Sequence, residues 1–167
     1  MLEGGHRRGI GRSNEVAALV ARDQRLFPEL IAGLWSDDPV VRTRAADAAE
    51  KVTRENCELL HPHKKELLGL AAETTQQELR WHLAAMLPRL RLSAKERQWA
   101  ASLMNQYLED HSSIVKTCAL QALADLAQGD AALWPQVIEA LREATRTGTA
   151  AMKARSRKLL LRCMQAR

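Results

Sequence analysis

The sequence has few aromatic residues, few cysteines and little glycine or proline, and each shortage excludes a class of protein. Aromatic side chains make up 4% of the 167 residues, and four of the six are tryptophan. Gly and Pro together number 13, and β-branched residues are scarce beside Ala and Leu, which argues against a β-sandwich or β-barrel. With 27% charged and 46% hydrophobic residues, the chain is neither disordered nor collagen-like. A globular chain long enough to bury a real core remains.

Cysteine usage and apolar runs indicate a compartment. The three cysteines, Cys57, Cys118 and Cys163, are an odd number without metal-type pairing, so we expect a reducing, cytoplasmic location without disulfides. The apolar run at 16–21 is too short for a secretory signal, and no run approaches the roughly 18 residues that span a bilayer. We therefore expect no membrane partner. The Gly- and Arg-rich residues 1–14 are predicted to be a flexible arm, and residues 15–167 a single domain.

An internal repeat predicts the architecture. Four segments align without gaps, with spacings of 38, 36 and 37 residues, and they begin at Val41, Leu79, Val115 and Met152. In each, apolar or small residues recur at offsets 0, 4, 7, 8 and 11, which is one face of an α-helix. Another apolar segment precedes each, and polar turns between the two supply capping oxygens. The pattern predicts an all-α fold of about four helical hairpins after a short helix at about 15–22, with neighbours burying each other's apolar faces.

The second segment of each hairpin carries a family resemblance. All four share an apolar-basic-x-x-small pattern, and the first is entered by Asp38-Pro39-x-Val41-Arg42. Over residues 24–165 the chain resembles the HEAT-repeat family, in particular its small bacterial-type members. The resemblance implies a right-handed α-α superhelix, a solenoid whose second helices line a concave groove. The resemblance is specific for this fold, but it does not indicate a particular function.

Two columns of polar residues follow from this register. Offset 1 is basic in every repeat. The resemblance implies a structural role for this column, because in HEAT proteins these side chains bond to turn acids and carbonyls. The residues concerned are Arg42, Arg80, Lys116 and Lys153, and their expected partners are Asp37, Asp38 and Asp110. Offsets 3, 6 and 10 lie within about 60° of one another and are expected to form a solvent-side stripe facing the groove. Trp81 lies beside this stripe, either as a binding anchor or packed over neighbouring second helices. Trp35 and Trp99 are expected to reach the core, and Trp134 to pack between hairpins.

Motifs for catalysis are missing from the sequence. It has no Gly-rich phosphate loop, no His-Glu-x-x-His and no Cys-x-x-Cys, and His61-Pro62-His63 has no third metal ligand nearby in sequence. Asp47 and Asp125 share the stripe beside Trp81, which is similar to the grooves of HEAT-like alkylpurine DNA glycosylases. One aromatic wall is too few for that chemistry. We therefore expect no enzyme activity, cofactor or metal.

The charge distribution leaves two binding hypotheses open. Residues 147–167 carry six basic and no acidic side chains, whereas residues 1–146 carry 19 basic and 20 acidic ones. The first hypothesis is a protein-interaction scaffold that holds a protein or peptide in the groove. The second is nucleic-acid binding at the basic C-terminal end. The alternative interpretation of that charge is a polar cap that keeps the terminal repeat soluble. Self-association through Leu161 and Met164 of the last helix is a third possibility. The predicted partner contacts are Arg44, Trp81, His82, Arg89, Arg155, Lys158 and Arg162.

Overall fold

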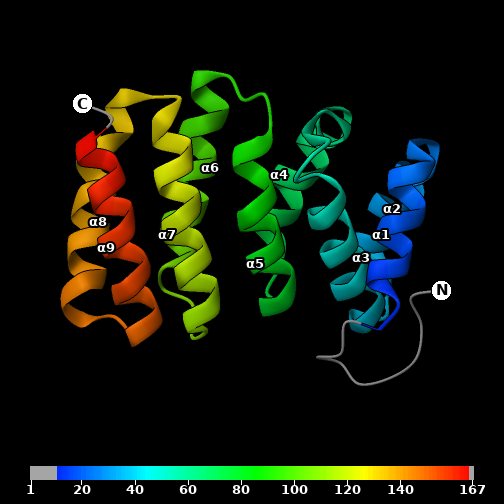
Figure 1. The fold of residues 1–167 in the computed structure, drawn as a ribbon, viewed down its shortest axis with the longest axis horizontal. Helices are drawn as coiled ribbons and strands as arrows, with labels where there is room; N and C mark the ends of the chain where they lie inside the picture. Colours follow the sequence, from blue (N-terminus) through cyan, green and yellow to red (C-terminus); the bar gives the residue numbers. More distant parts are fainter. Residues whose placement is uncertain (1–10, 166–167) are drawn as a thin grey trace. The chain divides into compact units, whose positions relative to one another are not determined.

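The computed structural model describes the backbone of residues 11–165 and the side chains of residues 11–163. Over this part the chain is all-α, with nine α-helices packed in sequential pairs (Figure 1). It divides into two compact units, the first ending at Leu90 and the second beginning at Arg91. No helix in the described part is long and apolar enough to cross a bilayer. The prediction of an all-α fold is confirmed, and the single domain over 15–167 stays a prediction.

The first unit contains five α-helices joined by short 3-10 turns (η). In order they are α1 (Ser13–Arg22), η1 (Gln24–Leu26), α2 (Phe27–Ala32), η2 (Gly33–Trp35), α3 (Pro39–Val52), η3 (Cys57–His63), α4 (Lys64–Glu73), α5 (Gln77–Met86) and η4 (Leu87–Arg89). Helix α2 packs on α3 and α4 packs on α5, while α3 also contacts α1 and α5. Helix α3 therefore lies at the centre of this unit.

The second unit contains two hairpins. Its elements are α6 (Ala94–Tyr107), α7 (Ser113–Gln128), η5 (Ala131–Leu133), α8 (Trp134–Thr147) and α9 (Ala150–Gln165). Helices α6 and α7 form one pair, α8 and α9 the next, and α7 also packs on α9 (Figure 1).

The predicted apolar face forms the core of both units. Every residue at offsets 0, 4, 7, 8 and 11 is buried or half-buried, and none is exposed. Leu83 of α5 and Leu123 of α7 are completely buried, as is Leu34 of η2, which precedes α3. Burial of a leucine of this kind contributes roughly 1.5–3 kcal/mol. Large side chains of the first helices, such as Phe27 and Leu67, are buried as completely, so both helices of a hairpin contribute to the core.

The polar turns cap three of the four second helices. Asp38 accepts a hydrogen bond from the Val40 amide at 2.7 Å, and Ser112 and Thr149 accept from the amides of Val115 and Met152, each at 3.4 Å. The turn before α5 differs, because Gln76 makes no side-chain cap. The prediction that every turn supplies a capping oxygen is therefore wrong for α5.

Gln76 reaches back to the preceding hairpin instead. Its amide nitrogen donates to the Pro39 carbonyl at 2.9 Å and to Thr43 Oγ1 at 2.8 Å, and its Oε1 accepts from Arg42 Nε at 2.8 Å. Arg42 also donates to the Ser36 carbonyl at 2.6 Å, and Arg80 donates to the Thr74 carbonyl at 2.8 Å. The expected structural role of the offset-1 column is confirmed for these two arginines.

Two sequence-based boundaries and placements need correction. Helix α1 begins at Ser13, two residues earlier than predicted, so Ser13 and Asn14 belong to the helix and not to the predicted flexible arm. Residues 1–10 of that arm lie outside the described part. Trp35 and Trp99 do not reach the core, since 46% and 44% of their surfaces are exposed. Each lies on the outer side of a first helix, where Leu34 and Ala100 next to them face inward.

Candidate functional site

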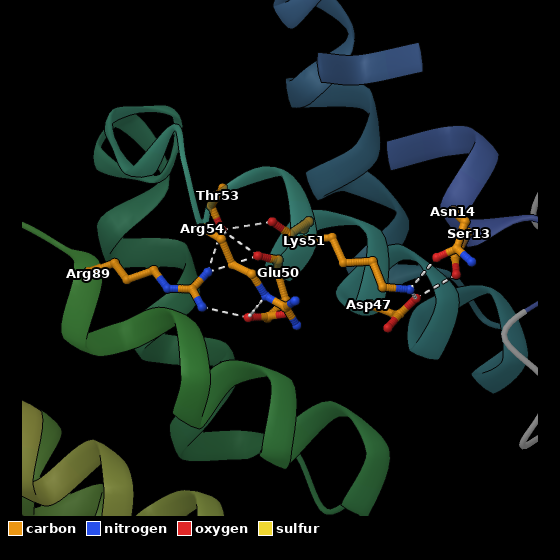
Figure 2. A network of polar contacts seen from close by, with 9 residues as sticks. Ser13, Asn14, Asp47, Glu50, Lys51, Thr53, Arg54 and Arg89 are labelled. Carbon is orange, nitrogen blue, oxygen red and sulfur yellow. Dashed lines mark hydrogen bonds and ion pairs between the residues drawn. The ribbon is translucent and has the colours of Figure 1, made fainter. Parts of the chain in front are cut away.

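The predicted contact residues of the first unit lie on one face formed by α3 and α5. This α3–α5 face comprises Arg44, Asp47, Glu50, Lys51 and Arg54 from α3 and the turn after it, with Trp81, His82 and Arg89 from α5 and η4. Positions three, four and seven apart lie on the same side of a helix, so the acids and bases of α3 are placed side by side on this face. Two networks of polar contacts order the face (Figure 2).

The first network ties α1 to α3. Asp47 accepts a hydrogen bond from Ser13 Oγ and forms an ion pair with Lys51, whose Nζ also donates to Asn14 Oδ1 at 2.6 Å. Ser13 is completely buried, so its hydroxyl depends on this carboxylate. The Asp47 and Lys51 side chains, predicted to be open to the groove, are instead used to attach the first helix (Figure 2).

The second network surrounds Glu50. Arg54 and Arg89 approach its carboxylate from two sides (Figure 2), Arg54 Nη2 reaching Oε2 at 2.6 Å and Arg89 Nη2 reaching Oε1 at 2.5 Å. Arg89 Nη1 also donates to the Glu50 carbonyl at 2.8 Å and to Thr53 Oγ1 at 3.1 Å. Because the Glu50 side chain is only 7% exposed, these donors replace the water it loses.

The arginines decide the ionisation of Glu50. Burial by itself would raise the pKa of this carboxyl, but the hydrogen bonds from Arg54 and Arg89 and their positive charges together lower it below its usual range. Glu50 is therefore a carboxylate at neutral pH, and Arg89 is a structural link between the two hairpins rather than an open contact residue.

Arg44 is also removed from the exposed surface. It was placed on the solvent side of α3, but it is 3% exposed, so that placement is wrong. The physical reason is the backbone that leads into α1: a Cβ added at Gly11 would lie 2.6 Å from the Arg44 guanidinium, and Gly11 has a φ of +53°. Glycine permits both this close approach and the left-handed conformation.

Trp81 and His82 remain as the aromatic part of the face. Both side chains are half-buried, and their ring centroids lie 5.7 Å apart at an angle of 58°. Burial lowers the pKa of His82, although the negative charges of Asp47 and Glu50 act in the other direction and Lys51 and Arg54 add to the lowering. At neutral pH His82 is accordingly a neutral, half-buried imidazole beside the indole.

His82 predicts an acid-sensitive stability. Its ordinary pKa is 6.5 and the folded value is lower, so below pH 6.5 the unfolded chain binds a proton that the folded chain does not. We expect the urea midpoint to fall as pH drops from 7.5 to about 5.5, and His82→Gln to reduce that fall. His111→Gln is the matched control, because it makes the same change at an exposed histidine of the second unit. Equal pH dependence in all three proteins would contradict this.

The basic contacts predicted for the second unit lie on α9. Arg155 and Lys158 are exposed, as is Arg157, and none of the three forms an ion pair with a described carboxylate. Arg155 Nη1 donates to the neutral Gln121 Oε1 at 2.9 Å, whereas Arg162 Nη2 donates to Asp125 Oδ1 at 2.6 Å. Arg162 is therefore a link between α7 and α9, and the exposed charge belongs to residues 155–158. Leu161 is 61% exposed, as expected, and the Met164 side chain lies outside the described part.

The hollows of the first unit lie elsewhere, and sequence reasoning missed them. One of about 510 Å³ is lined by α2, η2 and α4, and another of about 310 Å³ adjoins it, with Trp35, Leu70 and Glu73 lining both. A glycine in the middle of α4, Gly69, was the available sequence signal, because an interior helix glycine needs a reason. Among the described residues no three His, Cys, Asp or Glu side chains gather as a metal site requires.

Comparison with known proteins adds no assignment. No family model, no curated protein and no solved structure matches the chain.

Proposed function

We propose that this chain is a non-catalytic protein-interaction module, built as a HEAT-like solenoid whose second helices line a concave groove. The repeat of 36 to 38 residues supports the proposal, since each hairpin buries its apolar face only against its neighbours. The direct packing of α3 on α5 and of α7 on α9 is also what such a stack requires. A superhelix of this kind offers a broad curved surface for a protein segment.

The observation that carries the proposal is the Trp81–His82 pair. The indole is half-buried against an imidazole on a face already ordered by ion pairs, whereas the corresponding positions hold Thr43, Thr117 and Ala154. An aromatic side chain held in one conformation loses little entropy on binding, which is typical of interface anchors. Because Arg44 and Arg89 are used within the fold, the contact set of the first unit narrows to Trp81 and His82.

A capture experiment tests the role and the face together. The tagged full chain is used to isolate partners from native extract, and the affinity of a purified partner is then measured for Trp81→Ala and for Trp99→Ala. We expect about a tenfold weaker affinity for Trp81→Ala and no change for Trp99→Ala, an exposed indole of the second unit. A partner bound equally by wild type and Trp81→Ala would contradict the Trp81 surface, and the absence of any purified binder would contradict the role.

Nucleic-acid binding at α9 is the alternative, and one observation favours it. Arg155, Arg157 and Lys158 are exposed without a described carboxylate partner, so their charges are available to phosphates. The same protein is titrated with duplex and single-stranded oligonucleotides at about 50 and 200 mM salt. Salt-sensitive binding that is lost in Arg155→Glu/Lys158→Glu favours this alternative, whereas no binding at the lower salt removes it and leaves α9 as a solubility cap.

A further inference from the structure

The two adjoining hollows of the first unit form one groove on a different surface from the α3–α5 face. One side consists of α2 and η2, with Ile31, Ala32 and Trp35, and the other of α4, with Lys65, Gly69 and Glu73. Trp35 and Glu73 line both hollows, so they flank the place where the hollows meet. We call this surface the Trp35 groove.

Trp35 is the first of three residues here that do not serve the fold. Trp35 is 46% exposed at the edge of hollows that Ile31 and Leu70 also line, although large aromatic side chains usually gain stability by burial. Its own backbone neighbour, Leu34, fills the core position and is completely buried. The helix therefore has no packing need for a tryptophan at this place, and an exposed indole beside a hollow is typical of a binding anchor.

Gly69 is the second residue of the groove that does not serve the fold. Glycine is among the least favourable residues inside a helix, and it is retained in native helices where a neighbour approaches closely. At Gly69 an added Cβ would meet no atom within 4 Å. The folded chain itself gives no reason for this glycine, and the missing side chain keeps the middle of the groove open.

Glu73 is the third, and it sets the charge of the occupant. It is the last residue of α4, where a negative charge is unfavourable beside the helix dipole. It forms no ion pair with a described side chain: His63, which lines the same hollow, contacts Glu66 at 3.3 Å, and Arg42 donates to turn carbonyls and to Gln76. Arg42 lines the hollow on this side as well, but those hydrogen bonds of its guanidinium leave the Glu73 carboxylate open to a cation. At the other end of α4 the exposed Lys65 and Glu66 offset each other's charge, so a positive charge on an occupant is placed at the Glu73 end.

We propose that the Trp35 groove docks a protein segment that places a lysine or arginine side chain between the Trp35 indole and the Glu73 carboxylate, with an apolar side chain over Gly69. A cation over an indole face and beside a carboxylate gains from both contacts. The carbonyl end of α4 adds to the negative potential at the same place. The inference rests on the proposed role as an interaction module, but it uses a surface that Trp81 does not share.

A defined peptide probe tests this surface. A displayed library of random 12-residue peptides is selected on the full chain, and the enriched peptides are synthesised with their basic residue intact or replaced by norleucine. We expect a recurrent Lys or Arg beside an apolar residue, and affinity at least about fivefold weaker for the norleucine peptide. Trp35→Ala and Glu73→Gln should weaken binding by about tenfold and fivefold, whereas Trp99→Ala and Glu29→Gln should not.

Substitutions at Gly69 distinguish an effect on peptide binding from an effect on folding. Gly69→Ala should raise the Tm by about 2 °C or more, and Gly69→Leu should fill the groove and abolish peptide binding while the protein stays folded. The inference is overturned if no peptide is enriched, if no basic residue recurs, or if Trp35→Ala binds as tightly as wild type. Peptides lost in Trp81→Ala but kept in Trp35→Ala would overturn it and leave the proposed function standing.

Discussion

Arg89→Ala is expected to lower the free energy of unfolding of the first unit by about 2–3 kcal/mol. The variant removes one charged hydrogen bond from a carboxylate whose side chain is 7% exposed. It also removes a donor from Thr53 Oγ1 and one from the Glu50 carbonyl, which keeps the Thr53 hydroxyl at 3.3 Å. Arg54 remains on the other side of Glu50, which keeps the loss below that of a fully isolated buried charge. Urea denaturation measures the change.

Tryptophan fluorescence restricts that measurement to the first unit. In a Trp99→Phe/Trp134→Phe background the remaining indoles, Trp35 and Trp81, both belong to residues 11–90. Arg25→Ala is the surface control, because Arg25 pairs with Asp23 while 90% of its side chain stays exposed, and it should produce no measurable change.

Two further variants distinguish charge from geometry. Arg89→Lys keeps the positive charge but loses the planar donors, and it should recover only part of the stability. The double variant Glu50→Leu/Arg89→Met removes both partners and should be more stable than Arg89→Ala, since no buried carboxylate is left with only one of its two arginines. A double variant as unstable as the single one would contradict the assigned role of the pair.

The apolar register was predictable because helix periodicity and burial are direct consequences of sequence spacing. Leu83 at offset 4 and Leu123 at offset 8 correspond to Ala45 and Ala49 of the first repeat, and all four residues are completely buried. The offset-1 arginines were predictable for a related reason, since a long side chain at the start of a second helix reaches the turn carbonyls.

The surface was harder to predict because it depends on contacts between residues more than 30 positions apart. Nothing in the local sequence indicates that Gly11 covers Arg44, or that Arg89 turns back to Glu50. The Trp35 groove depends on the distance between two first helices, which the repeat pattern does not encode. Polar stripes in repeats therefore predict where charges lie, but not which charges stay exposed.

Ser156→Ala is expected to stabilise the second unit by about 1–2 kcal/mol. Ser156 is completely buried in α9, and its hydroxyl has no hydrogen-bond partner among the described residues. Offset 4 of the repeat holds Ala45, Leu83 and Ala119 elsewhere, all of them buried, so the packing environment is apolar. The substitution removes the cost of the buried hydroxyl and adds the better helix former.

The thiol of Cys163 measures this change within the second unit. It is buried near the end of α9, so in a Cys57→Ser/Cys118→Ser background its labelling by a thiol reagent requires opening of that helix. We expect labelling to slow by about 5- to 30-fold in Ser156→Ala and to stay unchanged in Ser102→Ala, whose hydroxyl is exposed on α6. Faster labelling in Ser156→Ala would mean that the hydroxyl supports the packing of α9 and that the fourth repeat does not share the apolar environment of the first and third. The direction of this one change therefore tests whether the repeat register extends to the last helix, on which the four-hairpin interpretation depends.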